Sequence, residues 1–126
     1  MIKIVLVEDD QDLSELIRLT LEIHGYDVVS EFNGLTAWNL LQQEQVDLIL
    51  LDIMLPEMDG FELNHRLKTG NTNRNTPVIM MSGWEQTALA LKAKETARIL
   101  DFLEKPFALR ILLDKIGTAF DSKLNN

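Results

Sequence analysis

Two short apolar stretches of this chain end in carboxylates. The first, "IKIVLV" at 2–7, runs into Glu8 and Asp9, and the second, "DLILL" at 47–51, runs into Asp52. If the three carboxylates meet they repel, since two unit charges about 5 Å apart cost roughly 3 kcal/mol at an effective dielectric of 20. Either one carboxylate keeps its proton at neutral pH, or a hard divalent cation lies among them. Mg²⁺ is the usual ion for an all-oxygen site with room for water, and Mn²⁺ is its substitute.

A hydroxyl and an ammonium group follow two further apolar stretches. Ser82 comes after "PVIMM" at 77–81, and Lys105 ends "LDFLEK" at 100–105. A carboxylate, a bound cation, a hydroxyl and an ammonium around one crevice make a site for phosphoryl transfer. In such a site Asp52 attacks phosphorus, the cation and Lys105 neutralise the phosphoryl oxygens, and Ser82 donates a hydrogen bond to one of them.

These residues meet only if the chain alternates between strands and helices in one sheet. Apolar runs of strand length alternate with segments of helical period, which predicts a parallel sheet covered by helices on both faces. We expect an open, doubly wound α/β domain with five strands in the order 2-1-3-4-5. Ligands bind such sheets beyond the carboxyl ends of the strands, here between the first and third strands. The predicted strands cover 2–7, 26–32, 47–51, 77–81 and 100–105, and the predicted helices cover 11–25, 35–45, 61–68, 84–98 and 109–120.

The helical segments carry apolar residues at helical spacing, and polar segments connect the elements. The segment "TGNTNRNT" at 69–76 is interpreted as a polar linker, and Asp59 and Gly60 as a turn in which Gly60 supplies backbone freedom. In the first helix, one face is predicted to carry Leu13, Leu16, Ile17, Thr20 and His24.

Length and composition set limits on the class of protein. The chain has 126 residues, 46% of them hydrophobic and 25% charged, which is typical of one globular domain; we expect it to cover 1–121, with a polar tail at 122–126. The absence of cysteine removes thiolate chemistry and disulfides, and no apolar run is long enough to cross a membrane, so a cytoplasmic location is expected. The net charge of −8 argues against direct nucleic-acid binding.

Four motifs resemble the receiver domains of two-component response regulators, which have a flavodoxin-like fold. They are "VEDD" at 7–10, "LILLDIMLPEMDG" at 48–60, "PVIMMSG" at 77–83 and "FLEKPF" at 102–107. The resemblance implies a signalling domain rather than an enzyme. It also implies that a histidine kinase or histidine phosphotransfer protein donates the phosphoryl group, and that a downstream protein effector reads a switched surface formed by the fourth helix, fifth strand and fifth helix.

The resemblance also assigns a role to each matching residue. Asp52 is similar to the phosphoacceptor, and the metal ligands correspond to Glu8, Asp9, Asp52 and the backbone carbonyl of Met54. Ser82 and Lys105 correspond to the phosphate-contacting residues. The switch residues correspond to Ser82 and Phe102, and the bond between Lys105 and Pro106 is a candidate cis peptide. The family implies a monomer or a weak, phosphorylation-dependent dimer.

The chain departs from the family pattern before its last strand. The family usually has a Gly-Ala pair there, whereas this chain has Arg98, Ile99 and Leu100, and Ser82 and Lys105 are 23 positions apart, one more than expected. We therefore expect a rebuilt connection into the fifth strand.

Three other functions remain open. A flavodoxin-like cofactor-binding protein needs a phosphate loop after the first strand, where this chain is acidic. A phosphatase with an aspartate nucleophile usually has a second acid two residues later, at the position of Met54. A docking module of receiver type would not need the acidic set.

Overall fold

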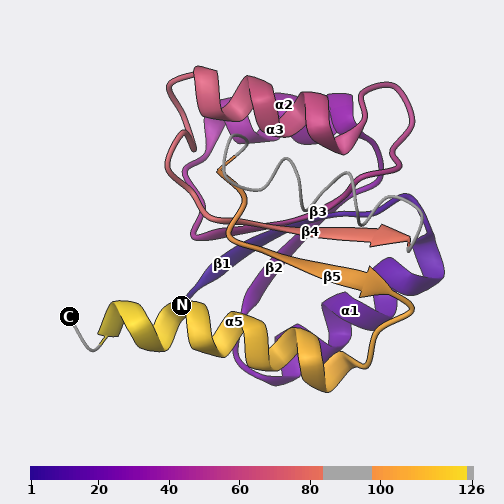
Figure 1. The fold of residues 1–126 in the computed structure, drawn as a ribbon, viewed down its shortest axis with the longest axis vertical. Helices are drawn as coiled ribbons and strands as arrows, with labels where there is room; N and C mark the ends of the chain where they lie inside the picture. Colours follow the sequence, from indigo (N-terminus) through magenta and orange to yellow (C-terminus); the bar gives the residue numbers. More distant parts are fainter. Residues whose placement is uncertain (84–97, 125–126) are drawn as a thin grey trace.

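The computed structural model describes residues 1–83 and 98–124, and its strands form one parallel sheet in the order β2-β1-β3-β4-β5 (Figure 1). This confirms the predicted fold class. The elements are β1 (Lys3–Val7), α1 (Gln11–Ile23), β2 (Asp27–Glu31), α2 (Gly34–Gln43), β3 (Leu48–Asp52), α3 (Gly60–Thr69), β4 (Val78–Gly83), β5 (Asp101–Lys105) and α5 (Leu109–Leu124).

The central strands are apolar throughout because both of their faces are buried. Along β3, Ile49 and Leu51 belong to the core beneath α2 and α3, while Leu48 and Leu50 belong to the core beneath α1 and α5. Figure 1 shows these two pairs of helices on opposite sides of the sheet. Since burying each such side chain contributes about 1.5–3 kcal/mol, the two cores fix the register of the strands and the positions of their ends.

Side-chain caps begin three of the helices, and each cap lies in a loop that borders the carboxyl edge of the sheet. Asp10 accepts a hydrogen bond from the backbone N–H of Leu13, and Asp59 accepts one from Glu62. Asn33 caps α2 in the same way. A cap of this kind contributes about 1 kcal/mol and sets the residue at which the loop becomes helix.

The structure corrects one predicted detail and refines another. In α1 the buried residues are Ser14, Ile17 and Leu21, whereas Leu16 is 52% exposed, so the predicted inward face was wrong in part. The segment at 69–76 does connect α3 to β4, as predicted, but Asn73 within it is buried.

Asn73 joins three segments of the chain. Its side-chain nitrogen donates to the carbonyls of Leu41 and Glu44, each at 2.7 Å, and its side-chain oxygen accepts from the backbone N–H of Val46 at 2.9 Å. Its φ of 62° lies in the left-handed region, which Asn adopts more readily than most residues. This network ties the end of α2 to the loop before β4.

Two predictions fall at the edges of the described residues. The helix expected at 84–98 lies outside them except for its last residue. The boundary at residue 121 stays a prediction, and α5 continues to Leu124. Within 1–83 and 98–124, the structure contains no helix that is both long and apolar enough to span a membrane.

Candidate functional site

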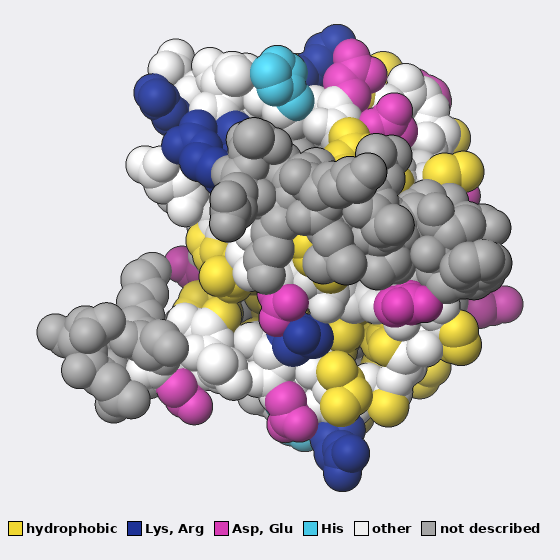
Figure 2. Space-filling model, in the orientation of Figure 1, with side chains coloured by type: hydrophobic (Ala, Val, Ile, Leu, Met, Phe, Trp, Pro, Cys, Tyr) yellow, Lys and Arg dark blue, Asp and Glu magenta, His cyan; other side chains and the backbone are white. Residues whose placement is uncertain are grey.

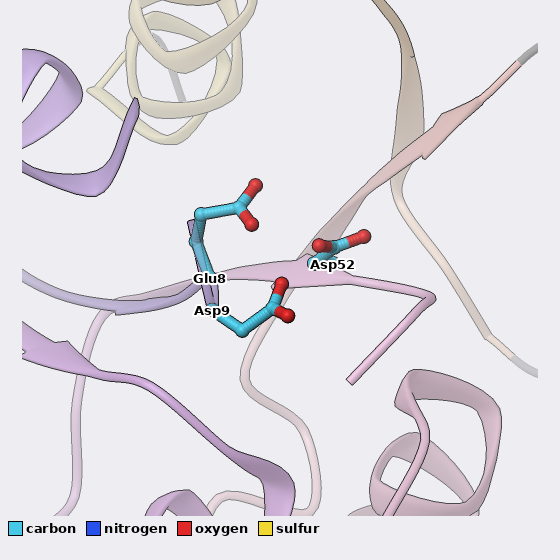
Figure 3. A group of neighbouring side chains, drawn as sticks. All are labelled: Glu8, Asp9 and Asp52. Carbon is cyan, nitrogen blue, oxygen red and sulfur yellow. The ribbon is translucent and has the colours of Figure 1, made fainter. Parts of the chain in front are cut away.

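Three carboxylates from two neighbouring strands meet at the carboxyl edge of the sheet. Val7 pairs with Leu51 in the ladder between β1 and β3, so the following residues Glu8 and Asp52 lie side by side. One oxygen from each of Glu8, Asp9 and Asp52 lies within 4.8 Å of the others. Figure 3 shows their carboxylates turned towards the space between the ends of the two strands. Two full charges at that separation repel by about 3 kcal/mol at an effective dielectric of 20.

Lys105 bridges the two buried carboxylates of this cluster. Its ammonium donates to Asp52 Oδ2 at 3.0 Å and to Glu8 Oε1. Glu8 is fully buried and Asp52 is 3% exposed, while Asp9 faces solvent. Three carboxylates and one ammonium leave an excess of negative charge when all are ionised, so the cluster attracts a cation.

Backbone groups fix the orientation of both buried carboxylates. Asp52 Oδ1 accepts a hydrogen bond from the backbone N–H of Met54 at 3.1 Å, and Glu8 Oε2 accepts one from Asp10 at 3.1 Å. The loop after β3 closes through the N–H of Gly60, which donates to the carbonyl of Ile53 at 2.9 Å. The Asp52 side chain therefore sits on a strand end that is braced by the loop following it.

Gly60 is needed for space, which differs from the predicted reason. A Cβ atom added at Gly60 would lie 2.4 Å from the backbone oxygen of Asp52 and 2.8 Å from Ile53 Cα. The first turn of α3 thus packs directly on the backbone of the proposed phosphoacceptor. The "MDG" sequence signals a turn but does not reveal this contact.

The pKa values of Glu8, Asp9 and Lys105 all lie above their ordinary values. Burial raises the pKa of Glu8, the Lys105 ammonium opposes this, and the Asp52 carboxylate reinforces it. Burial and the neighbouring Glu8 carboxylate raise the pKa of Asp9. Burial lowers the pKa of Lys105, but the hydrogen bonds and charges of Glu8 and Asp52 outweigh it, so the pKa lies above its ordinary value. Glu8 and Asp9 hold their protons more tightly than usual mainly because burial disfavours their charged forms, and the neighbouring carboxylates add to this effect.

The donor set fits a hard divalent cation. All three carboxylates offer oxygen, and Asp9 is exposed, so water can reach this side of the cluster. Mg²⁺ prefers oxygen ligands of this kind and keeps several waters. A thioether is too soft a ligand for Mg²⁺, so a contribution from Met54, which is 61% exposed, would come from its backbone carbonyl.

The remaining predicted site residues lie on β4 and β5. Asp52 pairs with Met81, so Ser82 lies one residue further along β4, where it is 1% exposed. Phe102 is half-buried and packs against the core beneath α2 and α3. The peptide bond between Lys105 and Pro106 is cis.

The sequence model of the response regulator receiver domain matches residues 4–117. The chain belongs to the response regulator receiver family. Receiver domains are signalling domains rather than classical enzymes; phosphorylation and Mg²⁺ binding are general features of the family, and its members interact with histidine kinases or phosphotransfer proteins.

Two relatives and one solved structure illustrate the range of this family. The response regulator receiver protein CpdR of Brucella abortus is 36% identical over 114 residues, which cover 90% of this chain and 92% of that protein. The DNA-binding dual master transcriptional regulator RpaA of Synechocystis is 34% identical over 114 residues, which cover 90% of this chain and 47% of RpaA. The receiver domain of the Pseudomonas aeruginosa sensor histidine kinase PA1611, with magnesium in its active site cleft, has a TM-score of 0.78 and 28% identity, and the match covers 92% of this chain and 94% of that one.

This receiver spans about half the length of several curated relatives that it matches. Because RpaA is named as a DNA-binding regulator, the expectation that the protein does not bind nucleic acid is not supported by its relatives.

Proposed function

We propose that this receiver accepts a phosphoryl group on Asp52 from a histidine kinase or a histidine phosphotransfer protein, with Mg²⁺ held by Glu8, Asp9, Asp52 and the Met54 carbonyl. The observation that carries the proposal is the meeting of three carboxylate oxygens within 4.8 Å, bridged by Lys105. The magnesium in the cleft of the PA1611 receiver supports the choice of ion. The receiver is proposed to span 1–121 and to act in the cytoplasm.

The transfer step uses one oxygen of Asp52 as the nucleophile. A P–O bond forms to Asp52 while the P–N bond of the donor phosphohistidine breaks, and the imidazole leaves with that electron pair and takes up a proton. Mg²⁺, when bound, supplies positive charge to the phosphoryl oxygens. The Lys105 ammonium, now 3.0 Å from Asp52 Oδ2, adds a second positive charge, and the Ser82 hydroxyl donates to one phosphoryl oxygen. In this sense the receiver assists its own phosphorylation and dephosphorylation.

The output of this step is a two-state switch. Phosphorylation draws Ser82 towards the phosphoryl group and turns Phe102 inward, which reshapes the face of β5 and α5 for a downstream protein effector or a weak dimer. The fourth helix of that face is only a prediction from the sequence, at 84–98, and all of this range except its last residue lies outside the described residues. The half-buried position of Phe102 supports its assignment, because the ring has no hydroxyl to satisfy when it turns inward.

The experiment is phosphorylation by a small donor. The protein is incubated with acetyl phosphate or phosphoramidate, with Mg²⁺ or with EDTA, and its intact mass is measured. We expect a gain of one phosphoryl group that requires Mg²⁺ and is lost in Asp52→Asn. Asp59→Asn, which changes an exposed carboxylate on the same loop, is the matched control and retains the gain. Metal-independent labelling, or equal labelling of Asp52→Asn, would contradict the proposal.

A further inference from the structure

A buried lysine with no carboxylate partner among the described residues lies at the opposite edge of the sheet. Lys68, in the last turn of α3, is only 7% exposed, and its ammonium donates to the Thr76 carbonyl at 2.6 Å. Among residues 1–83 and 98–121, no carboxylate lies within salt-bridge distance of it. Lysine is almost never buried unless it is paired, because removing the charge from water is costly.

Two arginines share a cavity with this lysine. A cavity of about 210 Å³ is lined by Lys68, Arg74, Arg98 and the backbone leading into β4 and β5. Arg98 donates to the Lys68 carbonyl at 2.9 Å, which holds its guanidinium at the cavity wall. Figure 2 shows Lys and Arg side chains gathered at the upper left of the molecule, over the loop between α3 and β4.

The positive charge of this cluster is not balanced by the surrounding protein that the structure describes. None of the three side chains forms an ion pair within 1–83 and 98–121, although the chain as a whole carries a charge of −8. The terminal carbonyls of α3 contribute only about half a negative charge. Burial and the Arg98 charge lower the pKa of Lys68 to about 8, as expected for an ammonium that lacks a counter-ion.

We propose that Lys68, Arg74 and Arg98 form a binding site for a small phosphate-type oxyanion. Guanidinium groups bind such ions through paired N–H donors, and lysine adds a point charge. The cavity is smaller than the roughly 300–1,000 Å³ of pockets for drug-sized ligands, so the ligand class is inorganic phosphate or a small phosphate monoester rather than a nucleotide.

The oxyanion site is independent of the acidic cluster. The six residues of β4 separate the two edges of the sheet, which is on the order of 15–20 Å at about 3.3 Å per residue. Arg98 immediately precedes the segment that leads into β5, so a bound anion would fix the start of the strand that ends at Lys105. Phosphorylation of Asp52 and occupancy of this site are therefore separately testable.

The test is a titration of the ¹⁵N-labelled protein with inorganic phosphate at pH 7.5 and constant ionic strength, in EDTA. We expect saturable shifts of the backbone amides of Asn75, Thr76 and Ile99, and no such shifts with chloride. Glycerol phosphate, added in a second arm, shifts the same amides if the cavity accepts a monoester; if it does not, the ligand is free phosphate. Non-saturating shifts, or shifts equal to those with chloride, would overturn the proposal.

Three variants distinguish phosphate binding at this site from non-specific attraction to positive charge on the surface. Arg74→Gln removes an exposed guanidinium and is expected to weaken phosphate binding by roughly 5–10-fold. Arg66→Gln changes an arginine that lies on α3 with Lys68 but pairs with Glu62, and it leaves the phosphate affinity unchanged. Wild-type affinity falls between pH 7.5 and 9 as Lys68 loses its proton, and Lys68→Met removes this dependence. Equal affinity in Arg74→Gln and the wild type would rule out the site.

Discussion

Replacing Gly60 by alanine tests the contact that positions Asp52. The new methyl group would lie 2.4 Å from the Asp52 backbone oxygen, about 1 Å closer than ordinary contact, and 2.8 Å from Ile53 Cα. Both of these are backbone atoms, which cannot rotate away. Overpacking of this kind costs about 1–3 kcal/mol. We therefore expect Gly60→Ala to lower the free energy of unfolding by about 2 kcal/mol, measured by urea denaturation followed by circular dichroism.

Gly117→Ala in α5 is the matched control. A Cβ atom there has no neighbour within 4 Å among the described residues. Since alanine is favoured over glycine inside a helix by about 0.5–1 kcal/mol, this variant should be more stable than the wild type. The two substitutions are chemically identical, but they should change the free energy of unfolding in opposite directions.

The same perturbation should also reach the chemistry. A shift of about 1 Å at a reacting group can cost on the order of 100-fold in rate, so Gly60→Ala should slow labelling by acetyl phosphate at least about 10-fold, while Gly117→Ala leaves it unchanged. If Gly60→Ala were as stable as the wild type and were labelled at the same rate, the reasoning about the packing of α3 on Asp52 would be refuted.

Three further predictions concern the pH, the metal and the loop before β4. The pKa of Glu8 is raised above 4.5 in the folded protein, so the stabilisation that comes from its protonation is complete below pH 4.5 and is lost as the pH rises through the folded pKa. Glu8→Gln cannot lose a proton, so its stability relative to the wild type should increase as the pH rises, measured by thermal unfolding in EDTA. Mg²⁺ at about 100 times its Kd should stabilise the wild type by about 2.7 kcal/mol but stabilise Asp9→Asn less, and equal Tm shifts would count against the metal site. Asn73→Ala should cost about 2–4 kcal/mol in urea denaturation because it leaves buried backbone groups unpaired, whereas the exposed Asn71→Ala should change stability by less than about 0.5 kcal/mol.

The sheet and the acidic cluster are predictable from the sequence because they depend on local patterns. Each central strand is a short apolar run, and its carboxylate comes directly after the run or at its end. Parallel pairing then brings Glu8 and Asp52 together without any knowledge of side-chain packing. The boundaries differ by one or two residues where hydrogen bonding decides them, as at Asp52, which belongs to β3 because it pairs with Met81.

The other features depend on partners that are distant in the sequence. Asn73 is buried because carbonyls about 30 residues earlier accept its hydrogen bonds. The buried Lys68 ammonium donates to the Thr76 carbonyl, which lies in the segment that leads into β4. Both residues resemble solvated polar residues in the sequence alone. In α1 the apolar residues occupy more than one face, so periodicity could not decide that Leu16 is exposed while Leu21 is buried.

The most direct measurement of the central claim is the position of the phosphoryl group. The protein, after reaction with acetyl phosphate and Mg²⁺, is reduced with borohydride, which converts an aspartyl phosphate to homoserine, and the modified residue is located by tandem mass spectrometry. We predict homoserine at position 52 alone, and none when EDTA replaces Mg²⁺. Homoserine at another aspartate, or unchanged aspartate at position 52 in protein that has gained a phosphoryl group, would contradict the account.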